Sequence, residues 1–191
     1  MATPQNSSPE ELITCFFDTV EELGQFLPIG AGNMTAPFRR LLDHEQHMTA
    51  VLTRNNQSRL VVDVLAERQT RSHYQREVLL RREADQVAVE YGMLQVDRNR
   101  LPANVNDAIA CADRPFGQLV QDLTLASSVT VEQFWRIEVG AQIAARTELG
   151  IGEVTFGRLV SIEIAGSSAV RALEILMPDQ ARVLASGAHS A

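Results

Sequence analysis

Several segments of the 191-residue chain alternate apolar and polar residues with a period of two. In one of them, Leu60, Val62 and Val64 alternate with Asp63 and its polar neighbours. A period of two is typical of strands that bury one face. The other segments that we expect to form strands are 48–54, 73–82, 87–93, 129–137, 156–164 and 169–177. The pattern therefore predicts six or seven long strands.

The connections between these segments indicate how the strands pair. Asn55-Asn56-Gln57 and Ala165-Gly166-Ser167 are too short for a parallel crossover and favour antiparallel hairpins. The helical spacing of apolar residues predicts a helix over 9–25, and shorter helices are expected over 37–42, 102–110 and 115–122. We therefore predict an α+β fold: one antiparallel sheet of six to seven strands, with helices packed on one face around an enclosed ligand cavity.

The length of the chain suits a single hydrophobic core. Residues 1–8 are polar and small and are expected to be a disordered lead-in, 9–178 to form one domain, and 179–191 to be a C-terminal tail. The start of the chain has no basic region, and no apolar run is long enough to span a membrane. We therefore expect a cytoplasmic protein without a membrane partner.

All 17 basic side chains are arginine, against 24 acidic ones, which gives a net charge of −7. The absence of lysine excludes Schiff-base chemistry and a phosphate-loop lysine. Arginine, whose planar fork matches a carboxylate, is then the natural ligand for an organic anion. The acidic balance argues against a nucleic-acid partner, because phosphate binding needs a clustered basic face.

Three charged residues share strand faces with apolar neighbours. Arg76 is in phase with Tyr74 and Val78. Arg158 is in phase with the apolar residues that alternate along its own strand, and Glu174 lies in a largely apolar strand. Burying a charge requires compensation, so these residues predict a buried polar site. One interpretation is a structural ion pair that fixes the register of the sheet. The other is an arginine that binds a substrate carboxylate and a glutamate that transfers a proton.

Other candidate sites carry less information. His44 and His47 could lie together on a helix, but the sequence indicates no third ligand, so no metal and no cofactor are expected. Cys15 lies beside two phenylalanines, and Cys111 has no histidine near it in the sequence to activate it. Gly150-Ile151-Gly152 is interpreted as a hairpin turn.

Five motifs occur in an order that resembles the chorismate pyruvate-lyase-like family, of the 4-hydroxybenzoate synthase type. They are His47-Met48-Thr49, Tyr74-Gln75-Arg76, Pro115-Phe116-Gly117, Phe156-Gly157-Arg158 and Leu173-Glu174-Ile175 followed by Pro178. The likeness runs from Leu41 to Pro178. It implies an antiparallel sheet with helices over a buried, enclosed ligand site, which agrees with the architecture expected from the periodicity.

The resemblance also implies an activity. Family members that are lyases convert chorismate to 4-hydroxybenzoate and pyruvate without a metal or cofactor. Arg76 would bind the ring carboxylate, Glu174 would act as acid or base at the hydroxyl end, and Arg158 would be a second cationic contact. The remaining substrate-binding residues would be Met48, Thr49, Phe116, Gly117 and Tyr74.

The sequence departs from the family pattern near this site. Thr53 stands where relatives usually have a glutamate, Phe116 and Gln118 replace leucine and arginine, and Phe156 replaces a tyrosine. Replacing leucine by Phe116 would reshape the cavity, and Phe156 removes a hydroxyl. The substrate of the family is therefore expected to carry over less well than its fold.

Three functions follow, in order of expectation. The first is a chorismate lyase, a cofactor-independent carbon–oxygen lyase that serves secondary metabolism. The second is another lyase or a pericyclic cyclase acting on a polyketide-type intermediate. The third is a non-enzymatic small-ligand-binding module, like the sensor domains of some transcription regulators; residues 1–40 are too short and too acidic for the winged helix of such a regulator. The sequence does not indicate the oligomeric state.

Overall fold

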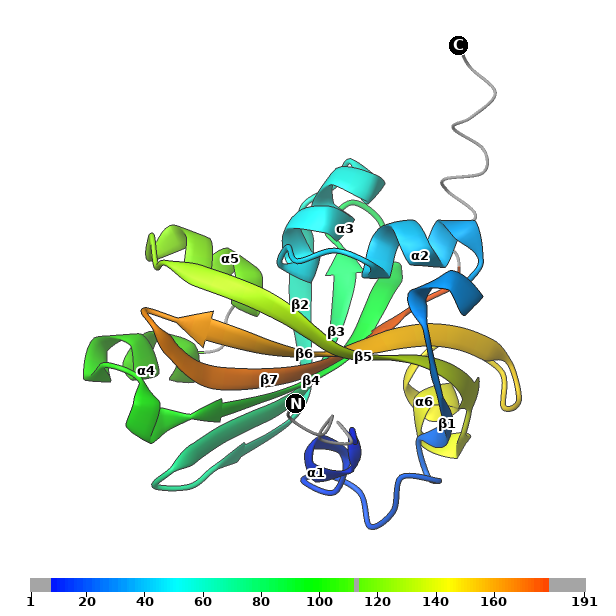
Figure 1. The fold of residues 1–191 in the computed structure, drawn as a ribbon, viewed down its shortest axis with the longest axis horizontal. Helices are drawn as coiled ribbons and strands as arrows, with labels where there is room; N and C mark the ends of the chain where they lie inside the picture. Colours follow the sequence, from blue (N-terminus) through cyan, green and yellow to red (C-terminus); the bar gives the residue numbers. More distant parts are fainter. Residues whose placement is uncertain (1–7, 112–113, 179–191) are drawn as a thin grey trace, which may run out of the picture.

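The computed structural model describes residues 8–111 and 114–178. Seven strands form one antiparallel sheet in the order β1-β5-β6-β7-β4-β3-β2 (Figure 1). Their bounds are β1 Gly24–Ile29, β2 Leu60–Gln69, β3 His73–Arg82, β4 Ala88–Asp97, β5 Ser127–Val139, β6 Val154–Ile164 and β7 Ser167–Leu176. The predicted α+β fold class is confirmed. The predicted tail, 179–191, and residues 1–7 of the predicted lead-in lie outside the described residues.

Four helices cover the face of the sheet that presents the side chains of Arg76, Arg158 and Glu174. They are α2 (Ala36–Leu42), α3 (Met48–Asn56), α4 (Ala103–Ala110) and α5 (Phe116–Asp122). The opposite face is covered as well, because α1 (Glu10–Ile13) and α6 (Ala141–Arg146) pack there against a second apolar core (Figure 1). The expectation of helices on one face thus describes only the larger of the two layers.

The prediction for residues 48–54 was wrong, since the structure has helix α3 there instead of a strand. The buried positions Met48, Val51 and Leu52 are three and four residues apart, which is the spacing of one helix face. The expected hairpin at 55–57 is the end of this helix, where Gln57 has a left-handed φ of 48°. The predicted turn at Ala165 and Gly166 is confirmed between β6 and β7.

The long helix expected over 9–25 is reduced to α1, four residues long. Its last part joins β1, in which Gly24 pairs with Val139 and Ile29 with Phe134 on β5. Pairing along β5 satisfies the backbone of this segment better than continued helix, because the sheet supplies both hydrogen bonds and packing. The Gly150–Gly152 segment follows α6 within the β5–β6 connection. No helix in the described part of the chain has the length and apolar character to cross a membrane.

Candidate functional site

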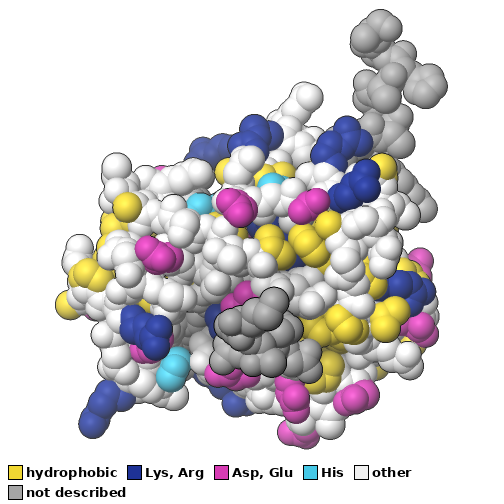
Figure 2. Space-filling model, viewed as in Figure 1, with side chains coloured by type: hydrophobic (Ala, Val, Ile, Leu, Met, Phe, Trp, Pro, Cys, Tyr) yellow, Lys and Arg dark blue, Asp and Glu magenta, His cyan; other side chains and the backbone are white. Residues whose placement is uncertain are grey.

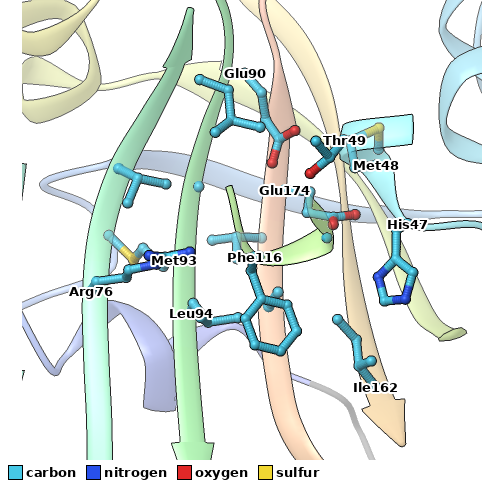
Figure 3. A pocket seen from close by; sticks show the side chains of 16 residues that line it. His47, Met48, Thr49, Arg76, Glu90, Met93, Leu94, Phe116, Ile162 and Glu174 are labelled. Atoms are coloured by element: carbon cyan, nitrogen blue, oxygen red, sulfur yellow. The ribbon is translucent and has the colours of Figure 1, made fainter. Parts of the chain in front are cut away.

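A cavity of about 50 Å³ lies between the centre of the sheet and helices α3 and α5. Its polar lining consists of Arg76 from β3, Glu90 from β4, Glu174 from β7, and His47 and Thr49 at the start of α3. Apolar side chains from β3, β4, β6, β7, α3 and α5 form the rest of the wall. Figure 3 shows Glu90, Glu174 and Thr49 near one another, with Arg76 apart from them at the left of the view.

The register of the sheet places the charged residues around Gly92. This glycine on β4 lies opposite Val78 on β3 and opposite Glu174 on β7, and Glu174 in turn lies opposite Arg158 on β6. A Cβ atom on Gly92 would lie 3.3 Å from Glu90 Oε1. The missing side chain therefore leaves the space in which the Glu90 carboxyl group lies.

Arg158 is fully buried, with no exposed surface, and its donors are taken by protein groups. Its Nε donates to Glu174 Oε2 at 2.6 Å. One terminal nitrogen donates to the carbonyls of Leu42 at 2.9 Å and His44 at 2.6 Å, and the other to the carbonyl of Gln46 at 3.1 Å. Arg158 therefore ties the connection between α2 and α3 to the sheet, and the ion pair with Glu174 matches the structural interpretation made from the sequence.

His44 and His47 belong to this tied connection. His44 Nδ1 faces two donors, Arg158 at 3.2 Å and the backbone amide of Gln46 at 3.2 Å, so its proton lies on Nε2 and bonds the Leu41 carbonyl. Burial, and next the charge of Arg158, lower the pKa of His44. Burial also lowers the pKa of His47, whose Nε2 lies 2.9 Å from the Ser127 hydroxyl. These surroundings favour the neutral form of both rings.

Arg76 contrasts with Arg158. Its side chain is 4% exposed, and its Nε has no hydrogen-bond partner. One terminal nitrogen lies at the long distance of 3.5 Å from the Arg114 carbonyl, and the Tyr74 hydroxyl is a further neighbour. Within ranges 8–111 and 114–178, no carboxylate forms an ion pair with Arg76. Burial lowers the pKa of this guanidinium and outweighs the opposing effects of Tyr74 and of the more distant Glu67 carboxylate.

Tyr74 supports Arg76 from outside the cavity lining. Its hydroxyl donates to Glu67 Oε2 at 3.1 Å. Burial, which outweighs the opposing charge of Arg76, raises the pKa of Tyr74 to about 12. Tyr74 thus stays neutral and fixes one side of the guanidinium.

Glu90 is the second buried charge without full compensation. It is 4% exposed, and its Oε2 has no hydrogen-bond partner. Burial, and next the negative charge of Glu174, raise the pKa of Glu90 well above its ordinary value, while Arg158 acts in the opposite direction. Glu90 therefore takes up a proton more readily than an exposed glutamate.

The helical side of the cavity is closed by a tight contact between α3 and α5. A Cβ atom on Gly117 would lie 2.9 Å from Thr49 Oγ1 and 3.1 Å from His47 Cβ. Gly117 is therefore a glycine because α5 approaches α3 too closely for a side chain. Beside it, Phe116 projects into the cavity and Met48 lines its edge (Figure 3).

The structure brings most of the predicted site residues together. Six of them line one cavity: Arg76, Glu174, Met48, Thr49, Phe116 and Gly117. Arg158 and Tyr74 instead stand behind it and position Glu174 and Arg76. Glu90 was not among the site residues predicted from the sequence, although a single carboxylate between Val89 and Tyr91 in an apolar run is a signal of a buried charge.

The opposite face of the sheet holds a buried polar cluster in which each group has a partner. Glu77 is 1% exposed and its Oε1 accepts a hydrogen bond from the Tyr91 hydroxyl at 2.6 Å. Arg146 forms an ion pair with the same oxygen at 2.6 Å and lies over the ring of Phe17. Glu77 is the neighbour of Arg76 on β3, so its side chain points to the opposite face of the sheet.

Arginine and acidic side chains are interspersed on the face of the molecule seen in Figure 2. This face therefore has no concentration of one charge comparable to the charged groups inside the protein. Among the described residues, no three His, Cys, Asp or Glu side chains are grouped so that they could hold a metal ion.

No protein-family model and no curated protein matches the chain. Several solved structures are similar to it. One, from Staphylococcus aureus, is described only as a gene product; it is 14% identical over 62% of this chain and 82% of its own, with a TM-score of 0.46. A second, from Bordetella bronchiseptica, is described as the ligand-binding domain of a regulator assigned to the GntR family; it is 8% identical over 63% and 86%, with a TM-score of 0.47.

A third similar structure is described as the C-terminal domain of a histidine utilization repressor from Pseudomonas syringae. It is 13% identical over 64% of this chain and 94% of its own, with a TM-score of 0.44. The likeness is distant in all three cases, and no role of any residue follows from it.

The predicted chorismate lyase function, and with it the carbon–oxygen lyase class, is corrected by these findings. Two of the three structures are described as domains of regulators, and none of the three as a lyase. The cavity agrees with the correction. Pockets for drug-sized ligands measure about 300–1,000 Å³, far more than this cavity, and Arg158 offers no donor for a second carboxylate because its donors bind protein groups.

Proposed function

We propose that this chain is a small-ligand-binding module whose ligand presents a carboxylate to Arg76. The observation that carries the proposal is a guanidinium, 4% exposed, that lines a cavity with an unpartnered Nε. An isolated buried charge costs several kcal/mol unless it is neutralised. A ligand carboxylate would supply a directly bonded counter-charge and could bond the guanidinium with both oxygens.

The rest of the lining favours a ligand with a short apolar body. Val78, Leu94, Phe116 and Ile162 surround the space between the two polar ends. Such walls exclude water and strengthen the contact between Arg76 and an anion. The net charge of −7 gives an anion no long-range attraction, so the affinity must arise inside the cavity.

A ligand of this kind must widen the cavity as it binds. A volume of about 50 Å³ holds only a few water molecules. The contact between Gly117 and Thr49 closes the helical side, so separation of α5 from α3 is the movement that would admit a ligand. Ligand binding would then change the packing of the helices, which is how a binding module without catalysis can transmit a signal.

The test is calorimetric titration with short aliphatic carboxylates and benzoate, each compared with its neutral amide. We expect the carboxylates to bind and the amides not to bind. Arg76→Gln should weaken carboxylate binding at least tenfold, because a hydrogen bond to a charged group contributes about 1.5–3 kcal/mol.

The matched control is Arg81→Gln, an arginine on the same strand that bonds the partly exposed Asp63 at 3.2 Å. This variant should bind carboxylates like the unaltered protein. Equal binding of carboxylates and amides, or equal loss in the two variants, would contradict the proposal.

A further inference from the structure

Glu90 and Glu174 make the cavity bipolar. Glu90 lines the end away from Arg76 and has an unpartnered Oε2, although the residue is only 4% exposed (Figure 3). A buried oxygen without a partner loses its hydrogen bonds to water without replacement. This end of the cavity therefore lacks a hydrogen-bond donor, just as the other end lacks an anion.

The two carboxyl groups meet over Gly92. A Cβ atom on residue 92 would lie 3.3 Å from Glu90 Oε1, and Glu174 is the cross-strand neighbour of Gly92 on β7. Both side chains line the same cavity, so a group placed above Gly92 contacts both.

The two carboxyl groups share a single cation. Arg158 bonds Glu174 through Nε, and its terminal nitrogens are engaged by the carbonyls of Leu42, His44 and Gln46. None of these hydrogen bonds from Arg158 is made to Glu90. The missing partner at this end is consequently a donor that also brings positive charge.

We propose that this cavity selects amino carboxylic acids, with the ligand carboxylate on Arg76 and its protonated amine between Glu90 and Glu174. The inference rests on the proposed function, because it assumes that Arg76 holds the carboxylate. At ordinary sheet spacings, the Cα atoms of Arg76 and Glu174, two strands and two residues apart, are separated by roughly 12 Å. After both side chains extend inward, the remaining gap suits a short chain between the amine and the carboxylate.

Binding of the amine also moves a proton. Burial and the neighbouring Glu174 favour the protonated form of Glu90 in the empty cavity, and the approach of an ammonium group favours its carboxylate form, so that binding shifts the proton toward the solvent. The charged and titratable groups around Glu90 are Glu174 on β7, Arg158 on β6, Arg76 on β3 and His47 at the start of α3. A neutral hydroxyl group would not displace this proton.

The test compares ω-amino acids of three to six carbons with the hydroxy acids and the plain carboxylic acids of the same length. Calorimetric titration at pH 7 in two buffers of different ionisation enthalpy gives both the affinity and the number of protons released. We expect the best amino acid to bind at least tenfold more tightly than its plain carboxylate and, unlike that carboxylate, to release protons to the buffer.

Glu90→Gln should abolish both the preference for the amine and the proton release, while plain carboxylates still bind. The matched control, Glu163→Gln on the exposed side of β6, should change neither. Circular dichroism verifies that the variants are folded.

The inference is overturned if the amine binds no tighter than the hydroxyl or plain analogue, or if Glu90→Gln leaves the preference intact. Arg76-dependent binding of plain carboxylates would then leave the proposed function standing. If no carboxylate binds, the proposed function fails together with the inference.

Discussion

Arg158 and Arg76 lie on the same face of the same sheet, and both are almost completely buried. Arg158 bonds one carboxylate and three backbone carbonyls, whereas Arg76 has an unpartnered Nε and one long bond to a carbonyl. The same residue type in similar burial thus has two different environments. The difference teaches that the partners of a buried charge, more than its burial, separate a structural arginine from a binding one.

The carboxylates repeat this contrast across the sheet. Glu77 on one face accepts bonds from Tyr91 and Arg146, whereas Glu90 on the other has an oxygen without a partner. Arg76 and Glu90, the two buried charged residues with an unpartnered atom among the described residues, both line the cavity beneath α3 and α5. An empty binding site is expected to hold such groups, because the ligand completes their hydrogen bonds.

The largest effect on the free energy of unfolding is expected from Arg158→Met. This change leaves Glu174 without its cation and removes the donors from Leu42, His44 and Gln46. Removing one partner of a buried ion pair costs about 3–5 kcal/mol, so the free energy of unfolding measured in urea should fall by that amount. Arg171→Gln serves as a control, because its ion pairs with Glu11 and Glu132 are partly exposed.

The control should lose no more than about 1 kcal/mol, as is usual for exposed pairs. If Arg158→Met were no less stable than the control, the structural role of Arg158 would be refuted.

Arg76→Met is expected to change the free energy of unfolding in the opposite direction. The change removes an unpaired buried charge and keeps an apolar side chain of similar length, so the ligand-free protein should gain about 2 kcal/mol of unfolding free energy. Carboxylate binding should be lost at the same time. Thermal unfolding with and without ligand measures both effects, and a large loss of stability in Arg76→Met would show that Arg76 is structural.

The pH dependence of Glu90 gives the smallest expected effect. Its pKa in the folded protein is raised above the ordinary 4.5. Between the two values the folded state binds a proton that the unfolded state has lost, so stability falls as the pH rises through this window, by at most about 1.4 kcal/mol per pH unit.

Glu90→Gln should remove this component. The lowered pKa values of His44 and His47 act in the opposite direction below pH 6.5, but they are present in both proteins and cancel in the difference. Parallel curves for the two proteins in urea unfolding across pH 4 to 8 would refute a raised pKa for Glu90.

The strands of this fold could be predicted because alternation reports a half-buried sheet directly. Residues 48–54 could not be distinguished in the same way, since Met48, Thr49 and Val51 suit either a strand or a helix. The choice between helix and strand depends on the position of the segment over the cavity, where only one face of a helix can be buried. The segment before β1 was similarly ambiguous, because its strand is defined by pairing with β5, more than 100 residues away along the chain.

The site was predictable in part. Strand phase correctly placed Arg76, Arg158 and Glu174 on one buried face. It could not show which arginine already has partners, because the carbonyls that bond Arg158 come from the connection between α2 and α3. Glu90 was overlooked because it alternates with Val89 and Tyr91, so strand phase assigned it to a solvated face, whereas β4 is buried on both faces.

The position of β7 has a consequence for how the chain folds during its synthesis. β7 is the last of the seven strands to be made, yet it lies in the centre of the sheet, between β6 and β4. The hairpin units β2-β3-β4 and β5-β6 can form earlier but remain separate until β7 joins them. β7 also carries Glu174. Almost the whole described chain must therefore be synthesised before Arg158 can pair with its counter-ion and before the sheet side of the cavity is complete.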